Sequence, residues 1–193
     1  MRFSDELIDD IREYKKTFRI NIMNWGAVIE NLKFLHDCCA ASEELLEDAA
    51  SRGPTSLVEY YRSHLEEERG ELACLTQDLR SVGVVSWMPN PIAMALIGTQ
   101  YYLLKHVKTV SLLGYMAVQE ADTIPIGVVK QLEQAHGKDL FRFVRMHAIK
   151  DLEHRKELIE VIDSVPEPDQ RFIVASAHST LQYLAKAMAE IYG

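Results

Sequence analysis

The spacing of the apolar residues limits the fold of this chain more than any other feature. Every long segment repeats apolar side chains at the steps of three and four residues typical of an α-helix, and no stretch alternates like a half-buried β-strand. We expect helices over residues 4–50 in two pieces, 56–83, 90–121, 125–136 and 138–163, and a last helix that ends at residue 192. The sequence therefore predicts a single all-α domain over residues 1–193, a bundle of about seven helices.

Local signals mark the ends of several of these helices. Asn90 is a favourable N-cap, and Pro91 suits the first turn that follows it. Ser56 with Glu59 three residues later resembles a capping box, and Gly137 is a typical helix stop.

The helix expected over residues 90–121 is apolar almost all round, which is typical of the buried centre of an all-α domain. Its Gly98 and Gly114 mark either close packing or a bend. Glu120 ends this helix, where a carboxylate is electrostatically unfavourable. It is either an ordinary residue that emerges into solvent or one that a metal ion or another cation compensates.

Charge and cysteine content exclude several classes of protein. The chain has 21 Lys and Arg against 29 Asp and Glu, a net charge of −8 without a basic cluster, which argues against nucleic acid or an anionic membrane as partner. The uncharged stretch 81–104 is interrupted at 89–91 and leaves too short a segment to cross a bilayer. Cys38, Cys39 and Cys74 form no secreted disulfide framework, and the N-terminus lacks the pattern of a signal peptide. We expect a soluble cytoplasmic protein with free thiols.

The helix expected over residues 138–163 carries the most informative polar pattern. Its apolar stripe, followed at alternating steps of four and three, includes His147, Asp151 and His154, which lie within roughly 60° of one another on the helix. Three ionisable groups on a buried stripe are costly unless they are paired. A divalent metal ion would pair them, because imidazole and carboxylate are both metal ligands. The alternative is a polar stretch exposed to solvent.

A second set of candidates lies on the helix expected over residues 56–83. His64, Glu68 and Glu71 share one face at steps of four and three, and Glu68 lies on the apolar stripe itself. The alternative is a solvated face, because charged residues are dense in this stretch.

Several other histidines and acidic residues are less informative. Glu133 and His136 have the spacing of a metal-binding pair, but Glu133 lies opposite the apolar face of its helix and is expected on the surface. His36, His106 and His178 are isolated, and packed or capped side chains explain each of them better than a ligand role. The sequence contains no nucleotide-binding loop, no nucleophile elbow and no zinc-binding cysteine cluster.

The order of these motifs resembles the haem-oxygenase-like di-iron oxidase superfamily, whose members have seven helices and are described as iron-containing redox enzymes. The resemblance covers roughly residues 57–192, and its most specific part is His147-x3-Asp151-x2-His154 preceded by Glu120. It implies a haem-oxygenase-like bundle that binds two iron ions per chain through three histidines and three carboxylates. The matching residues are His64, Glu71, Glu120, His147, Asp151 and His154, with Glu68 as the alternate ligand. One position departs from the family pattern, because Glu71 stands where relatives usually carry histidine and His64 lies seven residues before it.

The resemblance also implies an activity. A non-haem di-iron centre would activate O2 to oxidise a small organic substrate, with no catalytic residue beyond the metal ligands. An apolar wall would shield the oxidant from solvent, and the candidates for it are Tyr101, Tyr102, Leu104, Met116 and Phe143. The chain could also form a homodimer.

Three other functions remain open on the sequence alone. A metal-free or mono-metal member of the same fold could act as a binding protein or as a hydrolase without redox chemistry, and the Glu71 departure favours this alternative. Haem degradation would need a proximal histidine near the start of the chain, for which His36 is the candidate. A purely structural helical dimer is the last alternative.

Overall fold

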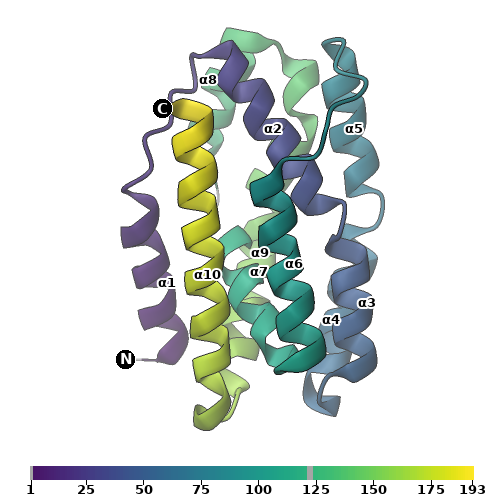
Figure 1. The fold of residues 1–193 in the computed structure, drawn as a ribbon, viewed down its shortest axis with the longest axis vertical. Helices are drawn as coiled ribbons and strands as arrows, with labels where there is room; N and C mark the ends of the chain where they lie inside the picture. Colours follow the sequence, from purple (N-terminus) through teal and green to yellow (C-terminus); the bar gives the residue numbers. More distant parts are fainter. Residues whose placement is uncertain (1, 121–123) are drawn as a thin grey trace.

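The protein folds into an elongated bundle of helices (Figure 1). The structure is a computed structural model that describes residues 2–120 and 124–193, apart from the side chains of residues 151–153. Within these ranges the regular structure is entirely helical, and the two ends of the chain lie at opposite ends of the long axis (Figure 1). The helices in chain order are α1 (Phe3–Lys15), α2 (Trp25–Cys39), α3 (Ser42–Arg52), α4 (Thr55–Glu68), α5 (Glu71–Ser81), α6 (Pro91–His106), η1 (Thr109–Ser111), α7 (Leu112–Glu120), α8 (Ile126–His136), η2 (Lys138–Phe141), α9 (Arg142–Ser164) and α10 (Glu167–Tyr192), where η denotes a 3-10 helix.

The described residues form more helices than the seven or so that the sequence predicts, because three expected helices are interrupted. The segment expected as two helices over residues 4–50 forms α1, α2 and α3. The helix expected over 56–83 divides into α4 and α5 at Gly70, whose φ of 84° lies in the left-handed region that favours glycine.

The helix expected over 90–121 divides in the same way into α6 and α7. Val107 leaves helical geometry with φ −120° and ψ −83°. The Ser111 hydroxyl then donates a 2.7 Å hydrogen bond to the Lys108 carbonyl and closes the turn of η1. Apolar spacing continues across all of these breaks, so it could not reveal them.

Of the three helix ends predicted from local signals, the structure confirms two, at Asn90 and Gly137. The Asn90 side chain accepts hydrogen bonds from the N–H groups of Ile92 and Ala93, and Gly137, with φ 97°, follows the end of α8. The capping box at Ser56 is wrong, because α4 begins at Thr55 with Pro54 in the N-cap position. The fixed backbone of a proline favours a helix start there, and this places Ser56 inside the first turn.

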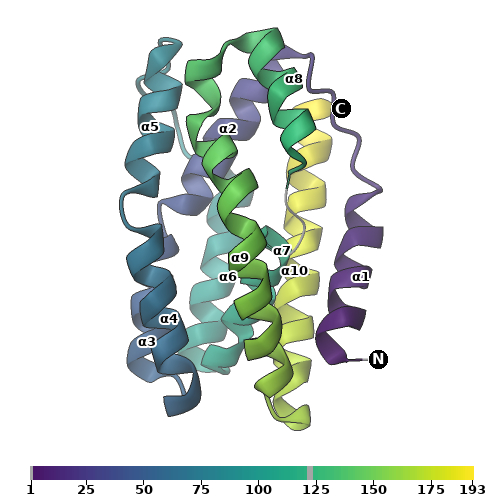
Figure 2. The same ribbon diagram turned by 180° about the vertical axis from the view of Figure 1, so that it is seen from behind.

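Two apolar cores meet along α9. The larger core joins α1, α3, α4, α6, α7 and α10 with the later part of α9, where Leu158 and Ile162 are buried. The smaller core joins the start of α2, α5, α8 and η2 with Phe143 and Val144 at the beginning of α9. Figure 2, which views the bundle from behind, shows α9 running along the side that faces the reader. Residues 147–154 of α9 therefore lie where the two cores adjoin.

The α7 helix lies inside the bundle and packs closely on α10. A Cβ atom on Gly114 would lie 2.1 Å from the Ile173 carbonyl oxygen and 2.8 Å from the Ala177 nitrogen, so this glycine marks close packing. Gly98 does not, because a Cβ atom there would meet no atom within 4 Å. The close approach of α7 to α10 holds Glu120, the last residue of α7, in a buried position.

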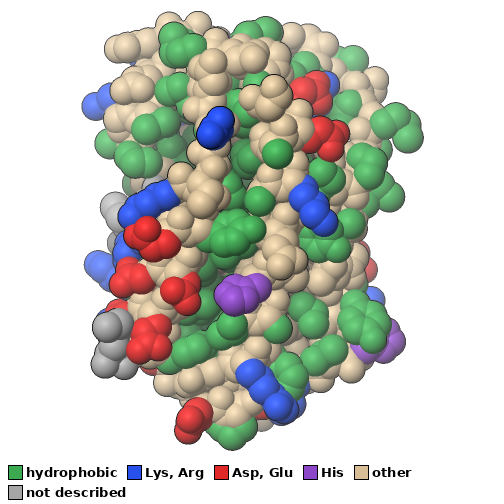
Figure 3. All heavy atoms as spheres, turned by 60° about the vertical axis from the view of Figure 1, so that its left-hand side comes forward, with side chains coloured by type: hydrophobic (Ala, Val, Ile, Leu, Met, Phe, Trp, Pro, Cys, Tyr) green, Lys and Arg blue, Asp and Glu red, His purple; other side chains and the backbone are tan. Residues whose placement is uncertain are grey.

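The surface agrees with the acidic composition. On the face shown in Figure 3, several acidic side chains lie together at the lower left, whereas lysine and arginine side chains are scattered. None of the helices in the described ranges is both long and apolar enough to span a bilayer.

Candidate metal centre

The first turn of α9 is anchored by a buried carboxylate on a neighbouring helix. Asp78 of α5 is fully buried and accepts hydrogen bonds from the Phe143 N–H (2.8 Å) and from Arg142 Nε (2.7 Å). This contact fixes the beginning of α9 against α5 and so sets the position of His147 and, two turns further along, of His154.

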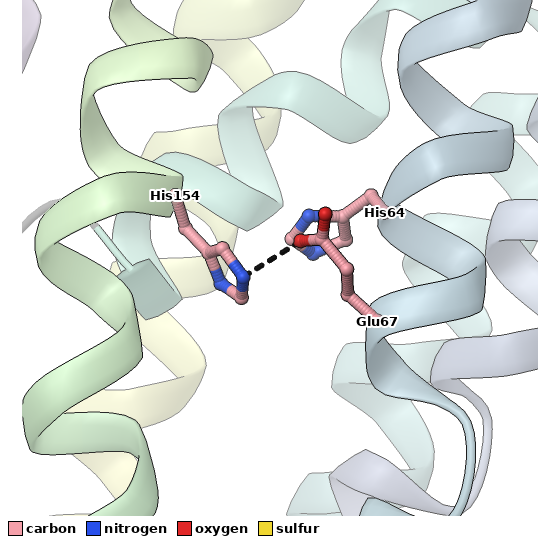
Figure 4. A group of neighbouring side chains, drawn as sticks. All are labelled: His64, Glu67 and His154. Atoms are coloured by element: carbon pink, nitrogen blue, oxygen red, sulfur yellow. Dashed lines mark ion pairs between the residues drawn. The ribbon is translucent and has the colours of Figure 1, made fainter.

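His64, Glu67 and His154 form a group that could hold a metal ion. His64 and Glu67 belong to α4, and His154 belongs to α9. Figure 4 shows their side chains pointing toward one another. One ligand atom of each lies within 4.8 Å of the others, and His154 Nε2 lies 2.8 Å from a Glu67 carboxylate oxygen. Both histidines are buried, whereas the Glu67 side chain is 39% exposed. Among the side chains that the structure describes, this group has the spacing of a metal site.

Glu120 and Glu68 extend this group into the protein. Glu120 Oε1 lies 3.2 Å from His64 Nε2, and Glu68 Oε1 lies 3.7 Å from the same nitrogen. The second carboxylate oxygen of Glu120 is buried and has no hydrogen-bond partner among the described residues. A buried carboxylate oxygen in this state favours a cation nearby.

Several carboxylates lie close together in this group, and they shift the pKa values of its members. Burial on its own lowers the pKa of His64, but the neighbouring carboxylates of Glu120, Glu68 and Glu67 outweigh it and raise that pKa to about 9. Burial and the nearby Glu71 carboxylate raise the pKa of Glu68 to about 7. In the absence of a metal ion, protons therefore supply part of the positive charge at this site.

A second polar group lies beside the first, where the start of α5 meets α9. Glu71 is 5% exposed, and its Oε2 lies 2.7 Å from His147 Nε2. Its Oε1 accepts a 3.0 Å hydrogen bond from Lys150 Nζ. Burial tends to raise the pKa of Glu71, but His147 and Lys150 stabilise its charged form more strongly, so the pKa is lowered.

A cavity of about 290 Å³ connects the two groups. His64, Glu68, Glu120 and His147 line one part of it, and the rest of its wall is mainly apolar. The apolar wall includes Phe34, Leu45, Leu112, Met116, Phe143 and Val144.

The predicted shielding wall is correct for two residues of five. Met116 and Phe143 line the cavity, whereas Tyr101, Tyr102 and Leu104 do not. The expected helix breaks at Val107, which separates α6 from α7. Tyr102 on α6 is 62% exposed.

The structure brings together most of the residues that the sequence singles out. His64 and His154 meet in the first group with Glu120, and Glu71 and His147 meet in the second. Glu68 faces the cavity, as the apolar spacing predicts. Asp151 belongs to α9, but its side chain lies outside the described residues.

Sequence reasoning missed Glu67. It lies three residues after His64, a spacing that places two side chains on one helical face. That signal was available, but Glu67 stands among charged neighbours, and the apolar stripe passes through Glu68 instead.

Glu133, His136 and His36, which the sequence does not favour as ligands, have structural partners. Glu133 is paired with Arg145 and is only 11% exposed, so its predicted surface position is wrong because the arginine allows it to be buried. His136 lies 2.7 Å from the Ile22 carbonyl oxygen, and His36 lies 2.9 Å from the Thr76 hydroxyl. Neither ring belongs to the two groups described above.

Comparison with known proteins identifies the fold. The sequence matches no protein-family model and no curated protein. A solved structure, a domain of unknown function with a heme oxygenase-like fold from Shewanella denitrificans OS217, is similar with a TM-score of 0.73. The match covers 98% of this chain and 87% of that chain at 17% sequence identity. The chain therefore has the all-α haem-oxygenase-like fold that its motifs predict.

Proposed function

We propose that this protein is a non-haem iron oxidase or oxygenase that uses O2 to oxidise a small organic substrate. The observation that carries the proposal is the group of His64, Glu67 and His154, with Glu120 beside it, at the edge of a largely apolar cavity. Two histidines and one carboxylate are the ligand set typical of non-haem Fe(II) oxygenases.

The residues present are suited to an iron ion. The ligand atoms of the group are close enough to bind one ion, and the unpartnered oxygen of Glu120 provides a further donor. Iron bound there would supply a redox-active centre at which O2 can be reduced. We propose His64, Glu67, Glu120 and His154 as the ligands of this first ion.

The ligands of a second ion follow from the sequence resemblance together with the second polar group. Glu71 and His147 are in contact, and Asp151 is the third member of this predicted set. We accordingly propose that the loaded protein holds two iron ions per chain, with Glu68 as the alternate ligand.

The chain itself would bind the substrate and control protons. The apolar wall of the cavity would exclude water from the reaction. Glu68, with its pKa of about 7, would hold or release a proton at its carboxylate oxygen near His64. The buried Tyr60 hydroxyl has no hydrogen-bond partner among the described residues, and its ring lies 5.9 Å from the His64 ring. Because burial raises the pKa of Tyr60, this hydroxyl would stay protonated and available as a donor.

A mono-metal protein of the same fold is the second candidate function. The contact between Lys150 and Glu71 favours it, because an ammonium group already compensates the carboxylate of the second position. Haem degradation is not supported in the same way, because the His36 ring contacts Thr76 and does not line the 290 Å³ cavity.

Anaerobic titration of the metal-free protein with Fe(II), followed by exposure to O2, tests the proposal. We expect the parent protein to bind Fe(II) and to consume O2 as the iron is oxidised. Glu67→Ala, His154→Ala and Asp151→Ala should each lower the iron bound by at least one equivalent per chain.

Glu66→Ala is the matched control, because Glu66 is exposed and pairs with Arg69, the residue that follows α4. It should leave the iron content unchanged. The proposal is refuted if the parent protein binds no Fe(II), and the ligand assignment is refuted if Glu67→Ala and His154→Ala retain the parent stoichiometry.

A further inference from the structure

The contact between Lys150 and Glu71 places an ammonium group at the second of the proposed metal positions. Lys150 Nζ lies 3.0 Å from Glu71 Oε1, and Glu71 is among the most deeply buried carboxylates of the site. Lys150 lies three residues after His147 on α9, so one helix presents both the imidazole and the ammonium to the same carboxylate.

We infer that Lys150 competes with a metal ion for Glu71, so that the two metal positions fill in sequence, with the His64–Glu67–His154 position first. This inference rests on the proposed function and adds an order of loading to it. It makes Lys150 a residue that controls the metal content of the site without being a ligand.

The difference between the two positions follows from the chemistry of their partners. Glu67 and Glu120 of the first position contact the imidazoles of His154 and His64. An imidazole is itself a metal ligand, so at the first position the partners of the carboxylates become part of the site when the ion binds. An ammonium group has no free electron pair at neutral pH and must move away from the carboxylate before a divalent ion can take its place.

The position of Lys150 allows this movement. Its side chain is 40% exposed, whereas that of Glu71 is 5% exposed. A flexible lysine side chain at the surface can turn into solvent at little cost, while the buried carboxylate stays in place for the ion. Lys150 would therefore delay the second ion without excluding it.

Removing the charge of Lys150 should allow a metal ion to bind more tightly at the second position. Lys150→Met keeps most of the length of the side chain, and Lys150→Gln keeps a polar end. Lys156→Met is the control, because Lys156 is an exposed lysine on the same helix and its loss changes the total charge equally. Thermal unfolding followed by circular dichroism should show that all three variants are folded.

Anaerobic titration with Fe(II), and separately with redox-inert Mn(II), measures the affinity for each equivalent. We expect the parent protein and Lys156→Met to bind the second equivalent at least tenfold more weakly than the first. Both Lys150 variants should bind the second equivalent at least tenfold more tightly than the parent does, with the first equivalent unchanged.

Lysine labelling supplies an independent measurement. In the parent protein, acylation of Lys150, followed by peptide mass spectrometry, should increase as the second equivalent binds and not as the first does. Labelling of Lys156 should stay constant throughout.

The results separate failure of this inference from failure of the proposed function. If the first equivalent binds but the second is no tighter in either Lys150 variant, or if the parent binds both equivalents equally, the inference is wrong and the proposed function stands. If neither the parent nor the Lys150 variants bind any metal, both are wrong.

Discussion

Replacing Gly114 with alanine tests whether the packing of α7 against α10 holds Glu120 in the site. The new Cβ atom would lie 2.1 Å from the Ile173 carbonyl oxygen, about 1.3 Å short of the 3.4 Å at which ordinary contact begins. The Ala177 nitrogen, 2.8 Å away, obstructs it as well. Both obstacles are backbone atoms, so no side-chain rotation relieves the overlap and the two helices must separate.

The expected cost follows from two opposing effects. Overpacking of this kind costs roughly 1–3 kcal/mol and occasionally more, and alanine recovers up to about 1 kcal/mol of helix propensity relative to glycine. Because the overlap here is between backbones, we expect a net loss of about 2 kcal/mol in the free energy of unfolding for Gly114→Ala. Urea unfolding of the metal-free protein, followed by circular dichroism, measures it.

Gly98→Ala is the matched control, because a Cβ atom at this exposed position of α6 would meet nothing within 4 Å. It should stabilise the protein by up to about 1 kcal/mol. Gly114→Ala should also weaken the binding of the first Fe(II) equivalent, because displacement of α7 moves Glu120, whereas Gly98→Ala should not. Equal stabilities for the two variants would refute this account of the packing.

Three further predictions concern stability. Asp78→Ala removes the acceptor of the buried Phe143 N–H, and we expect urea unfolding to show a loss of about 2–3 kcal/mol. Asn90→Ala removes the cap of α6 and should cost about 1 kcal/mol in the same assay. The pKa of His64 in the metal-free fold is about 9 against an ordinary 6.5, so its stabilising contribution is fully present below about pH 6.5 and is lost as the pH rises through 9. The difference in unfolding free energy between the parent and His64→Gln should therefore shrink from pH 6 to pH 10, and a constant difference would contradict it.

Helical spacing predicted the inward face of α9 correctly because that face depends on local geometry alone. Apolar residues stand on both sides of His147 and His154 on one stripe, and both cores of the bundle adjoin this helix. A histidine on such a stripe must face the interior wherever the partner helices lie. The spacing could not identify which helix would supply the opposite side of the site.

The interruptions of the long helices limited the prediction more than any other feature. A continuous helix over 56–83 would place Glu71 two turns beyond His64 on the same face. The left-handed Gly70 instead begins a new helix at Glu71, which meets His147, and leaves Glu67 near the end of α4, where it meets His154. The candidate ligands that the sequence places on one helix therefore lie on two, α4 and α5. The spacing of residues along the chain does not give the angle between these two helices.

The balance of charge in the site gives a physical reason why the two proposed metal positions should differ. Glu67, Glu68, Glu71 and Glu120 gather within one part of the bundle, and carboxylates this close repel one another when all are ionised. In the metal-free fold, a proton on His64, a proton on Glu68 and the ammonium of Lys150 each supply positive charge where a metal ion would supply it. Protons leave when an ion binds, whereas a lysine has to move aside. The first position is therefore controlled by the exchange of protons and the second by the movement of a side chain, which is why the two positions should differ in affinity although their donor atoms are alike.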